Sequence, residues 1–132
     1  KFLMTKALVP LMKKNGYGRI VNMSSTTGRR GRVDAAIQYS TMEAGVLGFT
    51  RALAMQLAPF GITVNAIAPG TTRTPRAERH SEERLAATAR GIPVGRLGLA
   101  AEQAHAIWYL CTPGAAFTTG ATLDVNGGNW TG

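Results

Sequence analysis

Residues 62–70 read ITVNAIAPG, and this stretch decides the fold class. Its first seven residues form a short, nearly continuous run of apolar and β-branched side chains, which predicts a β-strand buried on both faces. Pro69-Gly70 ends the strand, because proline has no N–H to donate to a sheet ladder and the pair favours a turn. A strand of this kind is typical of a parallel sheet with helices on both sides.

The segments on either side alternate between helical and strand patterns. Helical spacing of apolar residues recurs over residues 1–14, 38–57, 81–90 and 101–110, whereas strand formers occupy residues 19–23 and 121–125. Residues 71–80 are polar and irregular, which predicts a loop. Helices between strands imply parallel pairing with right-handed crossovers. The sequence therefore predicts one α/β unit over residues 1–132, with a doubly wound parallel sheet.

The composition excludes several classes of protein. Cys111 is the single cysteine, so no internal disulfide can form, and we expect a reducing, cytoplasmic setting. No apolar run approaches the roughly 20 residues of a membrane span, so we expect no membrane association. His80 and His105 are isolated, and no metal-ligand spacing is present, so we expect no metal site. Lys1 begins the sequence within a helical pattern, which indicates that the true start lies upstream.

The formal net charge of +8 would suit an anionic partner. Most of the arginines of residues 73–90 are interleaved with glutamates, and no nucleic-acid motif accompanies them. Solvated loops and helix faces explain this charge, so we expect no nucleic-acid partner.

Two hydroxyl-bearing residues are candidates for chemistry. In an open parallel sheet, ligands bind at the carboxyl ends of the strands, where the loops that begin at Ser24 and Pro69 lie. Tyr39 starts the long helix fourteen positions after Ser25, and a strand-loop-helix return can bring both hydroxyls to that edge. This arrangement would suit an alcohol or carbonyl substrate. On these residues alone, a serine that caps backbone groups and a tyrosine that anchors the core is the simpler interpretation.

Four segments together make the sequence resemble a known family. They are GRIVNMSS (18–25), YSTMEAG (39–45), ITVNAIAPG (62–70), and TG (119–120) with DVNGG (124–128). In this order and spacing they are similar to consecutive signatures of short-chain dehydrogenases/reductases, over essentially the whole chain. The resemblance implies an NAD(P)-dependent oxidoreductase with a Rossmann-type fold, of which residues 1–132 would be the carboxy-terminal half, with the last three strands and their helices. A small-molecule substrate is implied, an alcohol or ketone, or else a carbonyl on a carrier.

The resemblance also implies roles for individual residues. Ser25 matches the serine that hydrogen-bonds the substrate oxygen, and Tyr39 matches the catalytic acid/base, which also contacts the cofactor. Pro69 and Gly70 match the pair beyond which the backbone meets the nicotinamide, and Thr72 and Thr74 match the threonine positions that contact the cofactor. The choice between NAD and NADP depends on residues outside this sequence.

Two departures from the family's pattern bear on activity. The glycine-rich turn that binds the cofactor pyrophosphate has no counterpart among these residues. Glu43 occupies the position of the family's lysine, four residues after Tyr39, and a carboxylate there disfavours the phenolate that a cation would favour. An arginine could replace that cation only by reaching in from Arg29, Arg30, Arg32 or Arg73. We therefore expect this chain alone to be inactive. The alternative is a non-catalytic Rossmann-like protein retained for assembly or ligand binding.

The long helix also predicts assembly. Gly45 and Gly48 each destabilise it by about 1 kcal/mol relative to alanine, which indicates a compensating role such as close packing. The resemblance implies that helices 1–14 and 38–57 pair with their copies across a two-fold axis, with Leu47, Leu53 and Met55 as candidate interface residues. We therefore expect a homo-oligomer.

Overall fold

The computed structural model describes residues 1–33 and 35–132. The helices are α1 (Phe2–Asn15), α2 (Ile37–Leu57), α3 (Glu82–Arg90) and α4 (Ala100–Cys111). The strands are β1 (Gly18–Met23), β2 (Ile62–Pro69), β3 (Thr72–Arg73), β4 (Gly98–Leu99) and β5 (Thr122–Val125). Short 3-10 helices are η1 (Thr26–Gly28), η2 (Ala58–Phe60), η3 (Ala77–Arg79) and η4 (Pro113–Ala115).

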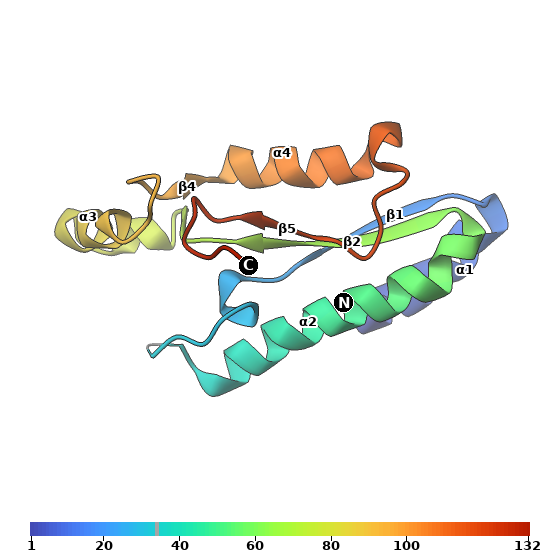
Figure 1. Cartoon of the computed structure of the whole chain (residues 1–132), viewed down its shortest axis with the longest axis horizontal. Helices are drawn as coiled ribbons and strands as arrows, with labels where there is room; N and C mark the ends of the chain where they lie inside the picture. The colour runs from blue at the N-terminus through green and yellow to red at the C-terminus, as the bar shows by residue number, and fades with distance from the viewer. Residues whose placement is uncertain (34) are drawn as a thin grey trace.

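The main sheet has three parallel strands in the order β1-β2-β5. Gly18 pairs with Ile62 at one end of the β1-β2 ladder, and Pro69 pairs with Val125 where β2 meets β5. Helices α1 and α2 cover one face of this sheet and α4 covers the other, as Figure 1 shows. The prediction of a doubly wound α/β fold is confirmed.

The centre of the sheet is β2, in which residues 62–68 are all buried. This burial explains the nearly continuous apolar run, because a strand flanked by two neighbours and covered on both faces has no solvent-facing side. The core beside it consists of Ala54, Leu57, Ile62 and Val64, with Val9, Met12, Ile20 and Leu53 packed against them. The helices α1 and α2 therefore pack against the sheet at β1 and β2.

The element boundaries agree with the sequence pattern, with one difference. Residues 71–80, expected to be an irregular loop, contain β3, which pairs with β4 in a separate two-stranded parallel sheet. Two-residue strands are too short to show a periodicity, so the pattern could not indicate this pairing. None of the helices in the described part of the chain combines the length and apolar composition that a membrane span requires.

Asn65 is a fully buried polar residue in the middle of β2. Its side-chain Nδ2 donates to the Thr118 carbonyl at 2.8 Å, and its Oδ1 accepts from the Ala121 N–H at 3.1 Å. The amide therefore satisfies two backbone groups of the turn that leads into β5.

We expect Asn65→Leu to lower the free energy of unfolding by about 2–4 kcal/mol, because each buried group left without a partner costs about 1–3 kcal/mol. Urea denaturation measures the change. Thr63→Val on the same strand is the matched control, since the Thr63 hydroxyl is buried without a partner among the described residues. That substitution should be neutral or stabilising, and an equal loss in both variants would contradict the role given to Asn65.

Candidate active site

The loop that follows β1 packs closely against the start of α2. The Ser24 hydroxyl donates to the Glu43 carbonyl at 2.9 Å, and the Ser24 N–H donates to the Ile67 carbonyl at 2.9 Å. A Cβ on Gly28 would lie 2.6 Å from the Glu43 carbonyl carbon, so only glycine permits this approach. The loop after β1 and the first turns of α2 thus meet at the carboxyl edge of the sheet.

Ser25 is half-buried and caps η1. Its Oγ accepts from the Thr27 N–H at 3.1 Å. A hydroxyl that accepts one hydrogen bond still carries a proton to donate. Ser25 therefore does cap a backbone N–H, as the simpler interpretation expected. Its hydroxyl proton remains available for a second hydrogen bond.

Tyr39 lies in the first turn of α2 and is 44% exposed, so it does not anchor the core. It lines an open hollow of about 460 Å³. The other lining residues are Thr27, Arg32, Ala35, Ala36 and Arg76. The structure thus places Tyr39 next to the loop that begins at Ser25, on a surface that a small molecule can reach.

Glu43 lies one helical turn after Tyr39 and is half-buried. Its Oε2 is buried and has no hydrogen-bond partner within the described part of the chain. The residue lines a groove of about 320 Å³ between α1 and α2, together with Lys1, Phe2 and Phe49. A carboxylate oxygen at this position is ready to accept a hydrogen bond.

Of the four arginines from which a replacement for the missing lysine would have to come, Arg29 and Arg30 have other partners. Arg29 pairs with Asp124 at 2.9 Å, and its guanidinium lies 4.8 Å from the centre of the Trp130 ring. Arg30 donates to the Asn129 amide oxygen at 2.7 Å.

The two remaining arginines near this edge differ in their surroundings. Arg73 pairs with Glu78 and Glu82, at 3.3 and 3.6 Å. Of the four arginines considered from the sequence, Arg32 is the one that lines the Tyr39 hollow. Arg76, which is not one of these four, lines the hollow as well.

Pro69 ends β2 at the same edge of the sheet, and Gly70, which follows it, lines a different hollow from that of Tyr39. The Gly70 N–H donates to the Val125 carbonyl at 3.0 Å, and a Cβ on Gly70 would lie 2.8 Å from the Asn126 Cα. Gly70 lines a hollow of about 270 Å³ that also contains Thr71. Close backbone packing therefore explains the glycine at this position.

Thr72 and Thr74 make local turn contacts. The Thr72 hydroxyl donates to the Gly70 carbonyl at 3.1 Å, and the Thr74 hydroxyl accepts from the Ala77 N–H at 3.3 Å. Thr71 lies in the walls of two hollows near this edge. The family resemblance pointed to Thr72 and Thr74 and did not indicate Thr71.

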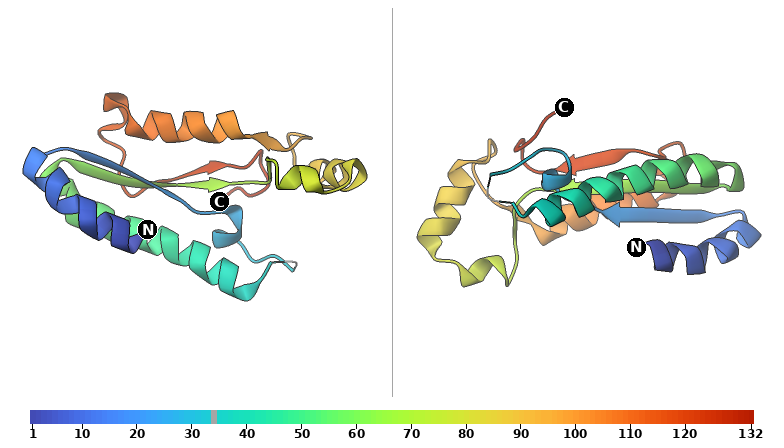
Figure 2. Two further views of the ribbon diagram at one scale, coloured as in Figure 1. Left: turned by 180° about the vertical axis from the view of Figure 1, so that it is seen from behind. Right: turned by 90° about the horizontal axis from the view of Figure 1, so that it is seen from below.

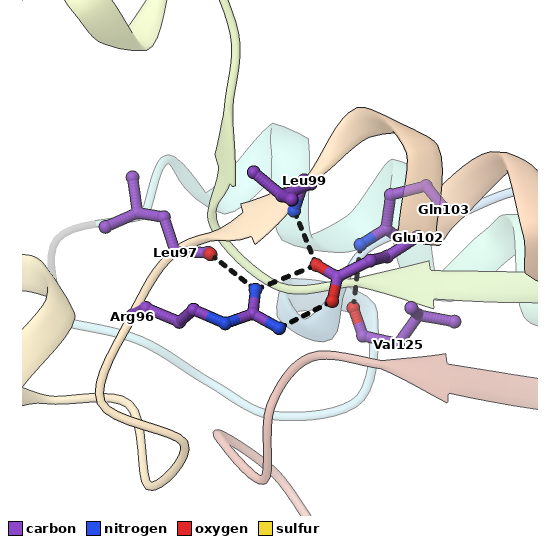
Figure 3. A network of polar contacts seen from close by, with 6 residues as sticks. All are labelled: Arg96, Leu97, Leu99, Glu102, Gln103 and Val125. Atoms are coloured by element: carbon purple, nitrogen blue, oxygen red, sulfur yellow. Dashed lines mark hydrogen bonds and ion pairs between the residues drawn. The ribbon is translucent and has the colours of Figure 1, made fainter.

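A polar network fixes the start of α4 beside this edge (Figure 3). Arg96 forms two hydrogen bonds with Glu102, at 2.9 and 2.6 Å, and Glu102 also accepts from the Leu99 N–H at 2.7 Å. The buried Gln103 donates to the Val125 carbonyl at 3.2 Å. The network links the segment between α3 and β4 to α4 and β5.

The Arg96 guanidinium and the Leu99 N–H hold the pKa of the Glu102 carboxyl at about 2, below its ordinary value of 4.5. Because the pKa of Glu102 is lower in the folded protein than in the unfolded chain, the ionised carboxylate stabilises the fold. This stabilisation is complete above about pH 4.5 and is lost as the pH falls towards 2. We expect Glu102→Gln to remove this pH dependence, which urea denaturation across that range measures. The exposed Glu83→Gln is the control and should retain it. Parallel curves for Glu102→Gln and the parent protein would contradict the pairing.

Comparison with known proteins decides the family. A family model described as enoyl-(acyl carrier protein) reductase matches residues 1–129. The chain belongs to the short-chain dehydrogenase/reductase family. Among the residues described, no group of three or more His, Cys, Asp or Glu side chains is placed to hold a metal ion.

Similar short-chain dehydrogenases/reductases include enzymes with different substrates. The chain is 38% identical over 130 residues to 2-dehydro-3-deoxy-L-rhamnonate dehydrogenase (NAD(+)) of a Sphingomonas species, covering 98% of this chain and 52% of that protein. It is 42% identical over 127 residues to 3-oxoacyl-(acyl-carrier-protein) reductase FabG of Vibrio cholerae, covering 96% of this chain and 52% of the relative. The chain thus spans about half the length of the curated relatives it matches.

Solved structures of short-chain dehydrogenases/reductases agree with the fold. A 3-oxoacyl-(acyl-carrier protein) reductase from Brucella melitensis matches with a TM-score of 0.94 and 37% identity, covering 99% of this chain and 49% of that structure. A second structure of such a reductase from Brucella melitensis, with bound NAD, matches with a TM-score of 0.90 and 37% identity, covering 99% of this chain and 48% of that structure. The expected family and its Rossmann-type fold are confirmed.

Proposed function

We propose that the full-length protein is an NAD(P)-dependent oxidoreductase that interconverts an alcohol and a ketone, or reduces a carrier-linked carbonyl. The observation that carries this proposal is the position of Tyr39, exposed in the wall of a hollow beside the loop that begins at Ser25. Family membership supports it, and relatives named for a sugar-acid dehydrogenase and for an acyl-carrier reductase span these two kinds of substrate.

Tyr39 and Ser25 divide the chemistry at the substrate oxygen. Tyr39 exchanges a proton with that oxygen, and Ser25 donates a hydrogen bond that stabilises its developing charge. The nicotinamide, when bound, supplies or accepts the hydride. Both hydroxyls need access to the same oxygen, which the packing of η1 against α2 supports.

The residues at this edge fit a nicotinamide cofactor in part. The buried Glu43 Oε2 lacks a partner among described residues, so it can accept hydrogen bonds from the hydroxyls of a ribose. Pro69, Gly70, Thr72 and Thr74 would contact the nicotinamide end. Because no glycine-rich phosphate turn is in the sequence, we propose that residues 1–132 form the carboxy-terminal half of a single Rossmann domain. We propose that this half alone is inactive.

The alternative is a non-catalytic protein of the same family, retained for assembly or ligand binding. Glu43 favours this alternative, because the next helical turn after Tyr39 then has no lysine whose positive charge would favour ionisation of the Tyr39 hydroxyl. The two functions differ in one measurable property, the use of a cofactor.

Fluorescence titration with NADH and NADPH tests the proposal. The full-length protein should bind one of them saturably at micromolar concentration, whereas the 132-residue chain should bind neither. No binding by the full-length protein would favour the non-catalytic alternative. Saturable binding by the chain alone, weakened by Thr74→Val, would show that the missing turn is not required.

We also propose a homo-oligomer that forms through α1 and α2. The views in Figure 2 show these helices beside each other on one face of the sheet. Apolar side chains on α1 are exposed: Phe2, Leu3, Met4, Leu8 and Leu11.

Of the expected interface residues, Met55 is 81% exposed, but Leu47 is buried and Leu53 packs against the chain's own core. Those two leucines were assigned to the wrong face of the helix. Apart from the backbone of α2 itself, a Cβ at Gly45 or Gly48 would meet no atom of the described residues within 4 Å, so the close packing expected there would need a partner.

Light scattering is expected to show a dimer or larger particle at micromolar concentration, because burial of this surface removes exposed apolar area from water. Leu8→Glu and Leu11→Glu together should shift the particle towards the monomer, whereas Arg90→Glu on α3 should not. A monodisperse, folded particle of the 132-residue chain near 14.0 kDa would contradict the proposed interface.

A further inference from the structure

Ser25 lies in a short turn whose two ends are held by different parts of the molecule. Before the turn, Ser24 binds the loop to β2 and to α2 through its N–H and its hydroxyl. Ser25 then caps η1, and Arg29 ends it, where the Arg29 N–H donates to the Thr26 carbonyl at 3.0 Å. Ser25 and Arg29 therefore stand at opposite ends of one turn of 3-10 helix.

The Arg29 side chain holds its end of the turn to β5. Its Nη2 pairs with Asp124 Oδ2 at 2.9 Å and donates to the Thr122 carbonyl at 3.2 Å. The loop that carries Arg29 follows β1, and β2 separates β1 from β5 in the sheet. Trp130, beyond the end of β5, places the centre of its ring 4.8 Å from the guanidinium. Arg29 therefore ties the loop of Ser25 to the opposite edge strand and to the segment after it.

The pair of Arg29 and Asp124 is better suited to fixing a position than to adding stability. The two side chains are 20% and 25% exposed, so both have lost most of their contact with water. Arg29 Nε and Asp124 Oδ1 are buried without a hydrogen-bond partner among the described residues. Such desolvation offsets much of the attraction between the charges. The guanidinium is nevertheless held by a carboxylate, a carbonyl and an aromatic ring, which leaves it little freedom to move.

The turn depends on this anchor because it is short. η1 contains three residues, and a single 3-10 turn has few hydrogen bonds to offset its loss of conformational freedom. The Ser25 Oγ accepts from the Thr27 N–H, and the Ser25 carbonyl accepts from the Gly28 N–H at 2.9 Å. Release of the Arg29 end would loosen these bonds and change the direction of the Ser25 hydroxyl.

We infer that Arg29 is a positioning residue, which holds the Ser25 hydroxyl towards the substrate oxygen through its contacts with Asp124 and Trp130. This inference rests on the proposed function, in which Ser25 donates to that oxygen. A donor stabilises the developing charge only at about 2.7–3.1 Å from the oxygen, and a displacement of about 1 Å can lower a rate about 100-fold. Arg29 acts through Ser25 and takes no part in the proton transfer.

Amide hydrogen exchange of the full-length protein, followed by mass spectrometry, tests the positioning without requiring turnover. Arg29→Met should accelerate exchange in peptides that cover residues 24–30 by about tenfold or more, because these amides are protected only while the turn stays closed. Arg29→Lys should restore part of the protection, since an ammonium can still pair with Asp124. Peptides from residues 62–68 should exchange at the parent rate, which shows that the fold is intact.

A double-mutant cycle shows whether Arg29 acts through Ser25. The background is the full-length protein with Glu43→Lys, because a lysine there favours ionisation of the Tyr39 hydroxyl. Arg29→Met should lower kcat about tenfold or more and change the KM for the cofactor little. When Ser25→Ala is also present, Arg29→Met should lower kcat less than about twofold further, because the hydroxyl that it positions is gone.

Arg19→Met is the matched control. Arg19 also donates to a carbonyl, that of Gly18 at 2.9 Å, and its guanidinium lies 4.5 Å from the centre of the Tyr17 ring. It lies near the start of β1, at the other end of that strand from the loop of Ser25. This variant should leave kcat and the exchange of residues 24–30 unchanged.

Unchanged exchange of residues 24–30 in Arg29→Met would overturn the inference. An equal loss of kcat with and without Ser25→Ala, or the same effects in Arg19→Met, would also overturn it. Absence of turnover with every ketone and every variant would refute the proposed function instead, and the exchange rates would still decide whether Arg29 holds the Ser25 turn.

Discussion

Replacing Glu43 by lysine in the full-length protein is expected to raise the rate of carbonyl reduction at least tenfold. The lysine would stand one helical turn from Tyr39, where a cation favours the phenolate that the present carboxylate disfavours. At about 4 Å, a unit charge contributes about 1 kcal/mol in water and about 4 kcal/mol at intermediate dielectric. Reversing the sign of the charge at position 43 therefore changes the proton affinity of the Tyr39 hydroxyl substantially. One recovered pK unit, about 1.4 kcal/mol, corresponds to the tenfold gain.

Steady-state rates of NADH or NADPH oxidation with a panel of ketones and oxo acids provide the measurement. Glu83→Lys is the control, because it makes the same change of charge at an exposed position on α3. It should leave the rate unchanged. Equal rates for the parent and Glu43→Lys proteins would show that another cation serves Tyr39, and Arg32 and Arg76 are the ones that line its hollow.

Tyr39→Phe, made in the Glu43→Lys background, is expected to lower kcat at least 100-fold. The ring stays in place while the hydroxyl that exchanges the proton is lost, and general acid/base catalysis typically contributes about 10²–10⁴-fold. The KM and the affinity for the cofactor should change little. The same steady-state measurement separates kcat from KM.

Tyr109→Phe is the matched control, because Tyr109 is exposed on α4, on the opposite face of the sheet. That variant should retain full activity. Retention of more than half the activity by Tyr39→Phe would contradict the role proposed for its hydroxyl.

The fold was predictable because its central strand and its longest helix have clear patterns of apolar residues. Residues 62–68 are mostly apolar and all buried, since β2 lies between two strands and has helices on both faces. The helix predicted for residues 38–57 differs by one residue from Ile37–Leu57. The β3-β4 pairing was missed because it consists of two-residue strands.

Part of the candidate site could not be predicted, because it depends on which loops converge. The sequence indicated Ser25 and Tyr39 through their positions after a strand and at a helix start. It did not indicate that Arg32 and Arg76, forty-four positions apart, would line one hollow. The arginines of residues 73–90 were interpreted as solvated charges, and spacing alone does not distinguish an arginine on an open surface from one that lines a hollow.

Helix orientation limited the prediction of the interface. Leu47 and Leu53 lie on the face of α2 that packs against this chain, whereas Met55 lies outside it. The apolar residues of α2 extend over much of its circumference, so the sequence does not show which of them face the sheet.

Transfer of deuterium is the most direct test of the proposed chemistry. The full-length Glu43→Lys protein is incubated with a ketone and with NADH or NADPH that carries deuterium at the transferable position of the nicotinamide. We predict that deuterium appears on the carbinol carbon of the alcohol, and that Tyr39→Phe in the same background suppresses its appearance. Cofactor binding without deuterium on any product of the ketone panel would contradict the proposal that this site is an oxidoreductase centre.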